Sequence, residues 1–371
     1  MKPNRPWIAG IAGVILITAI AVMLRPGEVR LPESANLPPS PATARDHPPT
    51  ALSPSTPTER ELKQVAAHPR SSRNASTQDE PEEPLFEKLL KGGSISLTED
   101  QVNAFLESHR RSADSLVALG DLASLREGME RFPSDALLKF QMAIKGETAE
   151  ERRSALRALT DLSPNNPLGD YLSAHRSIVE GDTEQALKNL ATASAKPSYY
   201  DFFLDQAQAR EELYLSTGMT PTDAKAAGMF GIEMPHLQEL RDLGRQLARL
   251  QEEHAAKGDV EKAEAIRDMG LNMAWQLQAS GSTLLHELVG VVIEKNLLQG
   301  ADPGTALLTD GTTAGQRLEA LDHRKDYIRE MAKYSDLLTR LPEHDLLSYL
   351  DRSKAMGEIN ALEWLSRKYE P

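Results

Sequence analysis

Two stretches of the chain share one short pattern: residues 180–187 read EGDTEQAL, and residues 257–263 read KGDVEKA. In both, a glycine permits a tight left-handed turn, and the aspartate after it stands where it can cap the next helix. An alanine four residues beyond the aspartate is small enough to let two helices approach closely. Each stretch therefore predicts a hairpin of two helices.

The sequence around these hairpins, from Leu85 to the last residue, is also helical in character. It is rich in Ala, Leu, Glu, Arg and Gln, which favour helices, and Val, Ile and Thr do not form alternating runs. Several segments have stripes of apolar residues at a spacing of three or four, which is typical of one face of a helix. Each of these segments follows a polar residue that can cap a helix N terminus: Thr98, Ser112, Thr148 and Asp182. Such stripes run over residues 116–129, 237–250, 284–298 and 318–341, the last predicting one long helix at 313–341. The fold class predicted is all-α.

Helix ends repeat as well as helix starts. The segment 156–167, LRALTDLSPNNP, and the segment 131–136, RFPSDA, both place proline where a second helix would end. With the two glycine–aspartate turns, these segments resemble the tetratricopeptide-repeat family over residues 112–280. The resemblance implies helix pairs stacked as a solenoid with a concave face that binds a peptide or protein. An irregular helical bundle is the alternative.

The resemblance has departures. Ser177 and Ala174 stand where the repeat expects tyrosine and glycine, and residues 197–231 and 281–371 do not fit the repeat. The alanines of the two turns lie 77 residues apart, which is about two repeat lengths plus an insertion. We therefore expect a tetratricopeptide-like region at 85–280 and a C-terminal helical region at 281–371 that packs on it.

The N-terminal part of the chain has a different organisation. After a short tail at 1–6, residues 7–24 carry no charge, and 18 residues of helix span roughly 27 Å, close to the thickness of a hydrocarbon core. This block predicts a transmembrane signal anchor in contact with the lipid bilayer. The sequence Ala19-Ile20-Ala21 leaves open a cleaved signal and a secreted form.

Residues 25–84 predict a disordered linker. The part at 26–84 holds 12 of the 23 prolines, and neither Phe, Trp nor Tyr, so it cannot bury enough apolar surface to order itself. Basic residues flank the anchor on both sides, so charge does not decide the topology. A spacer of this composition favours a helical domain outside the membrane. We expect a single-pass protein of a bacterial inner membrane with a periplasmic C-terminal domain.

The composition excludes several chemistries. There is no Cys, which removes thiol catalysis, disulfides and Cys-ligated metals. The net charge of −13 argues against a general nucleic-acid binder. No two histidines stand at HxxxH spacing: His286-Glu287 begins like the helix of zinc proteases, but Gly290 replaces the second histidine. His286 is therefore predicted to be a packed or solvated residue.

Other groupings carry equally little chemical signal. Two acidic triplets with one histidine each, 322–326 and 343–345, are of a kind that is frequent in acidic helical proteins. Aromatic residues at helical spacing lie in a core more often than in a binding pocket. We therefore predict core packing for the aromatic tract 199–203, for Trp275 and for Trp364. We accordingly predict no catalytic residue, no cofactor and no metal site, and no enzyme.

A membrane-anchored scaffold or adaptor is the function that this organisation favours. Its protein partner, another membrane or envelope protein, would contact the first helices of the pairs at Asp170, Ser173, Ser177, Leu247 and Gln251. Two alternatives stay open: a helical hydrolase that uses an acidic dyad in a deep pocket, and a self-assembling envelope protein that pairs through the helix at 313–341 and would form homo-oligomers.

Overall fold

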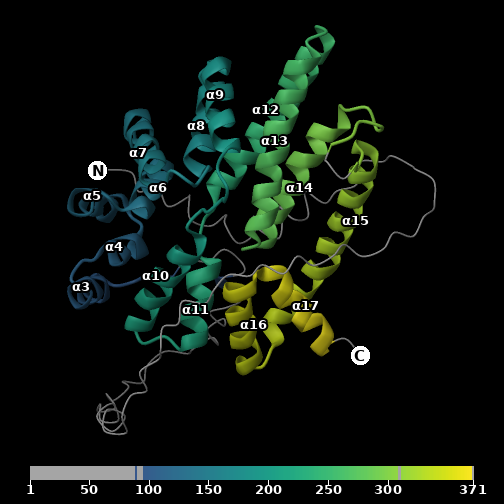
Figure 1. Cartoon of the computed structure of the whole chain (residues 1–371). Helices are drawn as coiled ribbons and strands as arrows, with labels where there is room; N and C mark the ends of the chain where they lie inside the picture. Colours follow the sequence, from purple (N-terminus) through teal and green to yellow (C-terminus); the bar gives the residue numbers. More distant parts are fainter. Residues whose placement is uncertain (1–87, 90–94, 308–310, 370–371) are drawn as a thin grey trace, which may run out of the picture. The chain divides into compact units, whose positions relative to one another are not determined.

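The prediction of an all-α fold is confirmed by a computed structural model, which describes residues 88–89, 95–307 and 311–369 (Figure 1). Among these residues there is no strand, only an isolated antiparallel bridge between Ala306 and Thr313. The predicted tail, anchor and linker at 1–84 lie outside the described residues. No helix within the described ranges has the length and apolar character needed to cross a membrane.

The helices follow one another with short connections. Their bounds are α3 (Glu99–Ser108), α4 (Ala113–Leu119), α5 (Leu122–Arg131), α6 (Ala136–Lys145), α7 (Ala149–Leu162), α8 (Leu168–Val179), α9 (Thr183–Ser194), α10 (Phe203–Ser216), α11 (Pro221–Phe230), α12 (Pro235–Ala256), α13 (Val260–Ser280), α14 (Leu284–Gln299), α15 (Ala314–Ala332), the 3₁₀ helix η1 (Lys333–Arg340), α16 (Glu343–Met356) and α17 (Glu358–Tyr369).

The predicted helix starts are where the sequence placed them. Thr98 and Thr148 form capping boxes with Gln101 and Glu151, and the Ser112 side chain accepts a hydrogen bond from the backbone of Ser115. These caps satisfy backbone N–H groups that the first turn of a helix leaves without a partner.

Two segments that were each predicted to form one continuous helix are interrupted. The stripe at 116–129 is divided because Gly120 adopts a φ of 65° and ends α4, after which Asp121 caps α5. The long helix expected at 313–341 ends at Ala332, and the chain continues as η1. Local turn chemistry overrides the apolar spacing in the first case.

The two glycine–aspartate turns build the predicted hairpins. Gly181 and Gly258 have φ values of 86° and 80°, in the left-handed region, and the turns join α8 to α9 and α12 to α13. Although the turns are far apart in sequence, α8 packs on α12 and α9 packs on α13, so the two hairpins are neighbours (Figure 1). The intervening α10 and α11 form a pair of their own, which contacts α4 and α16 instead. This pair occupies the stretch of sequence between the two glycine–aspartate turns.

A fully buried carboxylate, that of Glu294, joins α13, α14 and α15. Glu294 on α14 has none of its surface exposed, and it accepts hydrogen bonds from Trp275 Nε1 (2.8 Å) and Gln278 Nε2 (2.7 Å) on α13. Arg317 on α15 donates to both of its oxygens, from Nε at 2.5 Å and from Nη2 at 2.9 Å. Trp275 is half-buried against the core, as the sequence suggested, and Glu294 uses its indole N–H.

Candidate functional site: a buried aspartate between two histidines

The side chains predicted to bind a partner are distributed between interior and surface. Leu247 and Gln251 on α12 are buried, and buried Asp170 on α8 forms an ion pair with Lys196 Nζ at 2.5 Å. Ser173 and Ser177 on α8 are half-buried. A partner could reach the three buried residues only after the helices separate. Of the five predicted contact residues, the two serines are the ones accessible at the surface.

The two acidic triplets are occupied by basic side chains. Asp322 pairs with Lys295 Nζ at 2.5 Å, and Asp345 is bonded by Lys368 and by the hydroxyl of Tyr369. These carboxylates are therefore neutralised within the fold.

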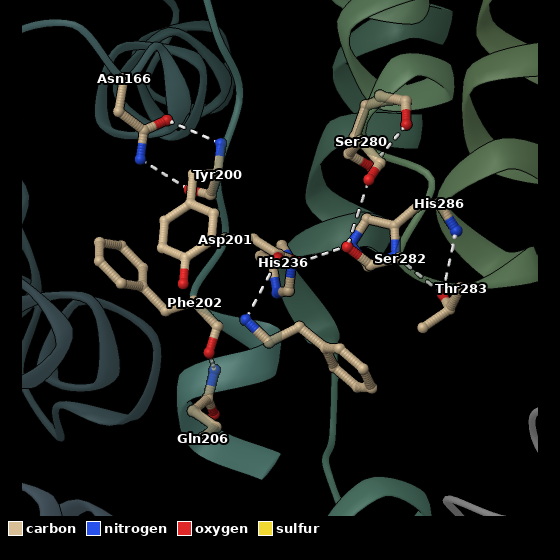
Figure 2. A network of polar contacts seen from close by, with 12 residues as sticks. Asn166, Tyr200, Asp201, Phe202, Gln206, His236, Ser280, Ser282, Thr283 and His286 are labelled. Carbon is tan, nitrogen blue, oxygen red and sulfur yellow. Dashed lines mark hydrogen bonds and ion pairs between the residues drawn. The ribbon is translucent and has the colours of Figure 1, made fainter. Parts of the chain in front are cut away.

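A third grouping, which the sequence prediction missed, lies in the interior. Asp201, His236 and His286 each direct one metal-ligating atom to a common point, and these atoms all lie within 4.8 Å of one another (Figure 2). Asp201 Oδ2 is 2.9 Å from His236 Nε2 and 2.5 Å from His286 Nε2. The exposed fractions are 4% for Asp201, 2% for His236 and 0% for His286. We call these three residues the Asp–His–His cluster.

Asp201 is positioned by the segment that joins α9 to α10. Asn166 holds the residue before it on both sides, because its Nδ2 donates to Tyr200 O (2.6 Å) and its Oδ1 accepts from Tyr200 N (3.2 Å). Gln276 on α13 donates to Lys196 O at 2.8 Å. After Asp201, Phe202 adopts a φ of 60° and a ψ of 18°, a left-handed conformation that costs roughly 1–2 kcal/mol in a non-glycine residue. The chain tolerates this strain where it turns the carboxylate inward.

Both histidines come from first turns of helices. His236 is the second residue of α12, after Pro235, and its ring packs edge-on against Phe140 with centroids 5.2 Å apart. His286 is the third residue of α14, and its Nδ1 lies 2.8 Å from the hydroxyl of Thr283, the N-cap of that helix. This hydrogen bond orients the ring so that Nε2 faces Asp201.

Electrostatics keep the aspartate charged although it is buried. Burial by itself would raise the pKa of Asp201, but the charge of His286 and the hydrogen bonds from both imidazoles outweigh it and hold the pKa well below its usual range. Asp201 Oδ1 also accepts a hydrogen bond from Phe203 N, the first backbone N–H of α10, and the partial positive charge of this helix N terminus favours an anion.

A pocket approaches the cluster from the side of α6. It has a volume of about 190 Å³ and is lined by Phe140, Gln141, Ile144, Lys145, Glu233, Pro235 and His236. His236 belongs to both the pocket and the cluster. One carboxylate, Glu233, lines this pocket, so it does not supply the acidic dyad of the hydrolase alternative.

The sequence contained little that could have revealed this cluster. Its members are 35 and 50 residues apart along the chain, and no local spacing links them. The tract at 199–203 was correctly assigned to the core for Tyr199, Phe202 and Phe203, which are buried. Gly290, the residue in place of a second zinc-protease histidine, has no room for a side chain: a Cβ there would lie 2.7 Å from Ala274 O.

Two imidazoles and one carboxylate can share protons or bind a divalent metal ion. As a hydrogen-bonded unit, the cluster ties the start of α10 to the starts of α12 and α14. It thereby fixes the inserted α10–α11 pair to the hairpin stack. Comparisons with models of known protein families, with curated proteins and with solved structures found no match for this chain.

Proposed function

We propose that this protein is a membrane-tethered adaptor whose helical hairpins bind a protein partner outside the bacterial inner membrane. The observation that carries the proposal is the direct packing of the α8–α9 hairpin on the α12–α13 hairpin, each built on the same glycine–aspartate turn. Hairpins that repeat one turn and stack on one another are the basis of tetratricopeptide-like binding surfaces. Residues 7–24 would be the anchor, in a single pass.

The tether sets what affinity the partner needs. A flexible linker over residues 25–84 has a root-mean-square reach of roughly 40–50 Å. A domain confined to that distance from the membrane meets other membrane proteins at a high effective concentration. Modest affinity at a helical surface is then sufficient, and the acidic body, with 33 basic and 46 acidic residues from Leu85 onward, is not drawn to anionic lipid.

The packing favours this function over the two alternatives. The apolar side chains of α15 and η1 that would pair two chains are already buried within one chain: Leu321, Ile328, Met331 and Leu338. Buried carboxylates such as Asp170 and Glu294 are neutralised by Lys196 and Arg317 and do not form a dyad.

Proximity labelling tests the proposal in the native cell. A labelling enzyme fused to the C terminus of the full chain should mark a small, reproducible set of envelope proteins. The double variant Ser173→Arg with Ser177→Arg places two long charged side chains on α8 and should lower labelling of the true partner at least about tenfold. The control Thr192→Arg, at an exposed position of neighbouring α9, should leave it unchanged. An identical labelling pattern in all three proteins would contradict a partner site on α8, and a purely cytoplasmic set would contradict the topology.

A further inference from the structure

We propose that the Asp–His–His cluster is a binding site for a divalent transition-metal ion of the Zn²⁺ class, with Asp201 Oδ2, His236 Nε2 and His286 Nε2 as ligands. This site is independent of the adaptor surface proposed above.

The donor set selects the class of ion. Imidazole nitrogen is a good ligand for Zn²⁺, Fe²⁺ and similar ions, whereas Mg²⁺ and Ca²⁺ prefer shells made of oxygen. Two histidines and one carboxylate are also a ligand set in which zinc retains an open fourth position. Cysteine, the other common zinc ligand, does not occur in the chain.

The distances are close to those that such an ion requires. At ligand bonds of about 2.0–2.1 Å, a tetrahedral ion holds neighbouring ligand atoms roughly 3.3–3.4 Å apart. The two Nε2–Oδ2 distances are 2.9 and 2.5 Å, so each pair has to open by less than about 1 Å. Small rotations of the two rings about their side-chain bonds would achieve this.

The surroundings of the ligands resemble an outer coordination shell. The Thr283 hydroxyl at 2.8 Å from His286 Nδ1 fixes the ring with Nε2 toward the site, the kind of second hydrogen bond that metal-binding histidines make. The second carboxylate oxygen, Asp201 Oδ1, accepts a hydrogen bond from Phe203 N at 3.2 Å. Oδ2 is therefore the carboxylate oxygen that remains for the ion.

A buried hydroxyl nearby has no partner among the described residues. Tyr199 is two residues before Asp201 and 8% exposed, and its Oη makes no hydrogen bond. Its ring centroid is 6.4 Å from that of His286, in an edge-on arrangement. An unsatisfied buried hydroxyl costs about 1–3 kcal/mol, and a fourth ligand position or a metal-bound water would satisfy it.

Each imidazole coordinates through Nε2 as a neutral ring with its proton on Nδ1. A ring that is an imidazolium therefore releases its Nε2 proton to solvent, whereas a neutral ring with its proton on Nε2 shifts that proton to Nδ1. The aspartate enters as a carboxylate, and no electron is transferred. His236 also lines the pocket that contains Phe140 and Glu233, so the ion would enter from this side.

The test uses the full chain in detergent micelles, freed of metal by a chelator and dialysed. Zn²⁺ is titrated in competition with a chromogenic chelator, and Co²⁺ serves as a spectroscopic probe. We expect one ion per chain. His236→Gln and His286→Gln should weaken binding more than about 100-fold, and Thr283→Val about 10–100-fold. His175→Gln is the matched control: this half-buried histidine faces one carboxylate, Glu239, at 3.6 Å, and its loss should not change the affinity.

Two results would overturn the proposal: no retained Zn²⁺ at an ion concentration equal to that of the protein, or equal affinity in the wild type and both glutamine variants. If a glutamine variant loses its helical circular dichroism, the Co²⁺ spectrum of the wild type decides. An intense visible band that Zn²⁺ abolishes supports a four-coordinate site with imidazole ligands. A weak band typical of six oxygen ligands contradicts it, and the cluster is then a permanent ion pair.

Discussion

Helix α14 contributes to two buried carboxylate centres, whose hydrogen-bonding partners differ in kind. Near its middle, Glu294 is held by an arginine, an indole and an amide, which satisfy both carboxylate oxygens. At its first turn, His286 shares the carboxylate of Asp201 with His236. Both carboxylates are buried, but the Glu294 centre is saturated by groups that keep their protons, while the Asp201 centre is bonded by groups that can release theirs.

The partners of a buried carboxylate decide what it can do. A guanidinium does not lose its proton in a protein, so the Glu294 centre can only hold α13, α14 and α15 together. Imidazoles change their charge near neutral pH and bind metals, so the Asp201 centre can hold helices together and also exchange an ion. The same depth in the core therefore serves a fixed clamp in one case and a candidate binding site in the other.

The largest effect is expected from breaking the clamp. Glu294→Ala leaves Arg317, Trp275 and Gln278 without their shared acceptor, and removing one partner of a buried ion pair costs about 3–5 kcal/mol. Urea unfolding of the full chain in micelles, followed by circular dichroism, measures it. Lys295→Ala, which removes a surface partner of Asp322, should cost less than about 1 kcal/mol. Equal losses in the two variants would mean that the clamp is not a principal support of the fold.

The second prediction is metal-dependent stability at the other centre. Free Zn²⁺ at 100 times its dissociation constant should raise the free energy of unfolding by about 2.7 kcal/mol. The gain should disappear in His286→Gln and persist in Lys295→Ala, because the latter leaves the cluster intact. Stabilisation that is the same in both variants would place the ion elsewhere.

A smaller effect separates two surface carboxylates that the sequence presents as equivalent. Asp182 caps α9 by accepting a hydrogen bond from Gln185 N at 3.0 Å, whereas Asp259 makes no such bond and instead lies 3.1 Å from His254 Nδ1. Asp182→Ala should therefore cost about 1 kcal/mol, and Asp259→Ala less than half of that. Thermal unfolding compares them, and a greater loss at Asp259 would contradict the assignment of the caps.

The smallest effect concerns pH at the start of α14. Burial raises the pKa of Glu358, although the hydrogen bond from Leu284 N (2.8 Å) and the charge of His286 oppose it. The pKa of Glu358 in the folded state lies above the unfolded value of about 4.3, so the folded state binds more protons than the unfolded state. The stability of the fold therefore falls as the pH rises from the unfolded pKa to the folded one. Glu358→Gln retains an acceptor for Leu284 and should gain stability relative to the wild type between about pH 4 and 7. Urea midpoints at both pH values measure it, and a constant difference would show that Glu358 does not titrate there.

Sequence reasoning succeeded where the cause of a structure is local. Caps such as Thr148, turns such as Gly181, and the apolar stripe of α12 each depend on residues within one or two helical turns. It failed at Gly120, where one left-handed residue divides a continuous stripe, and at Ala332, where α15 gives way to a 3₁₀ helix. The likeness to tetratricopeptide repeats stays a prediction.

The Asp–His–His cluster could not be predicted in this way. It exists because Asp201, two residues before α10, lies beside the first turns of α12 and α14, which carry His236 and His286. Asp201 within an aromatic tract and His286 beside an N-cap each have an ordinary local explanation. Only the tertiary arrangement brings them within hydrogen-bonding distance.

X-ray absorption at the zinc edge, on the full chain loaded with one equivalent of Zn²⁺, tests whether the Asp–His–His cluster binds the ion. We expect a first shell of nitrogen and oxygen at about 2.0–2.1 Å, with the multiple scattering of two imidazole rings. In His236→Gln this scattering should fall to that of one ring. A shell of oxygen alone, or a spectrum that the substitution does not change, would contradict it.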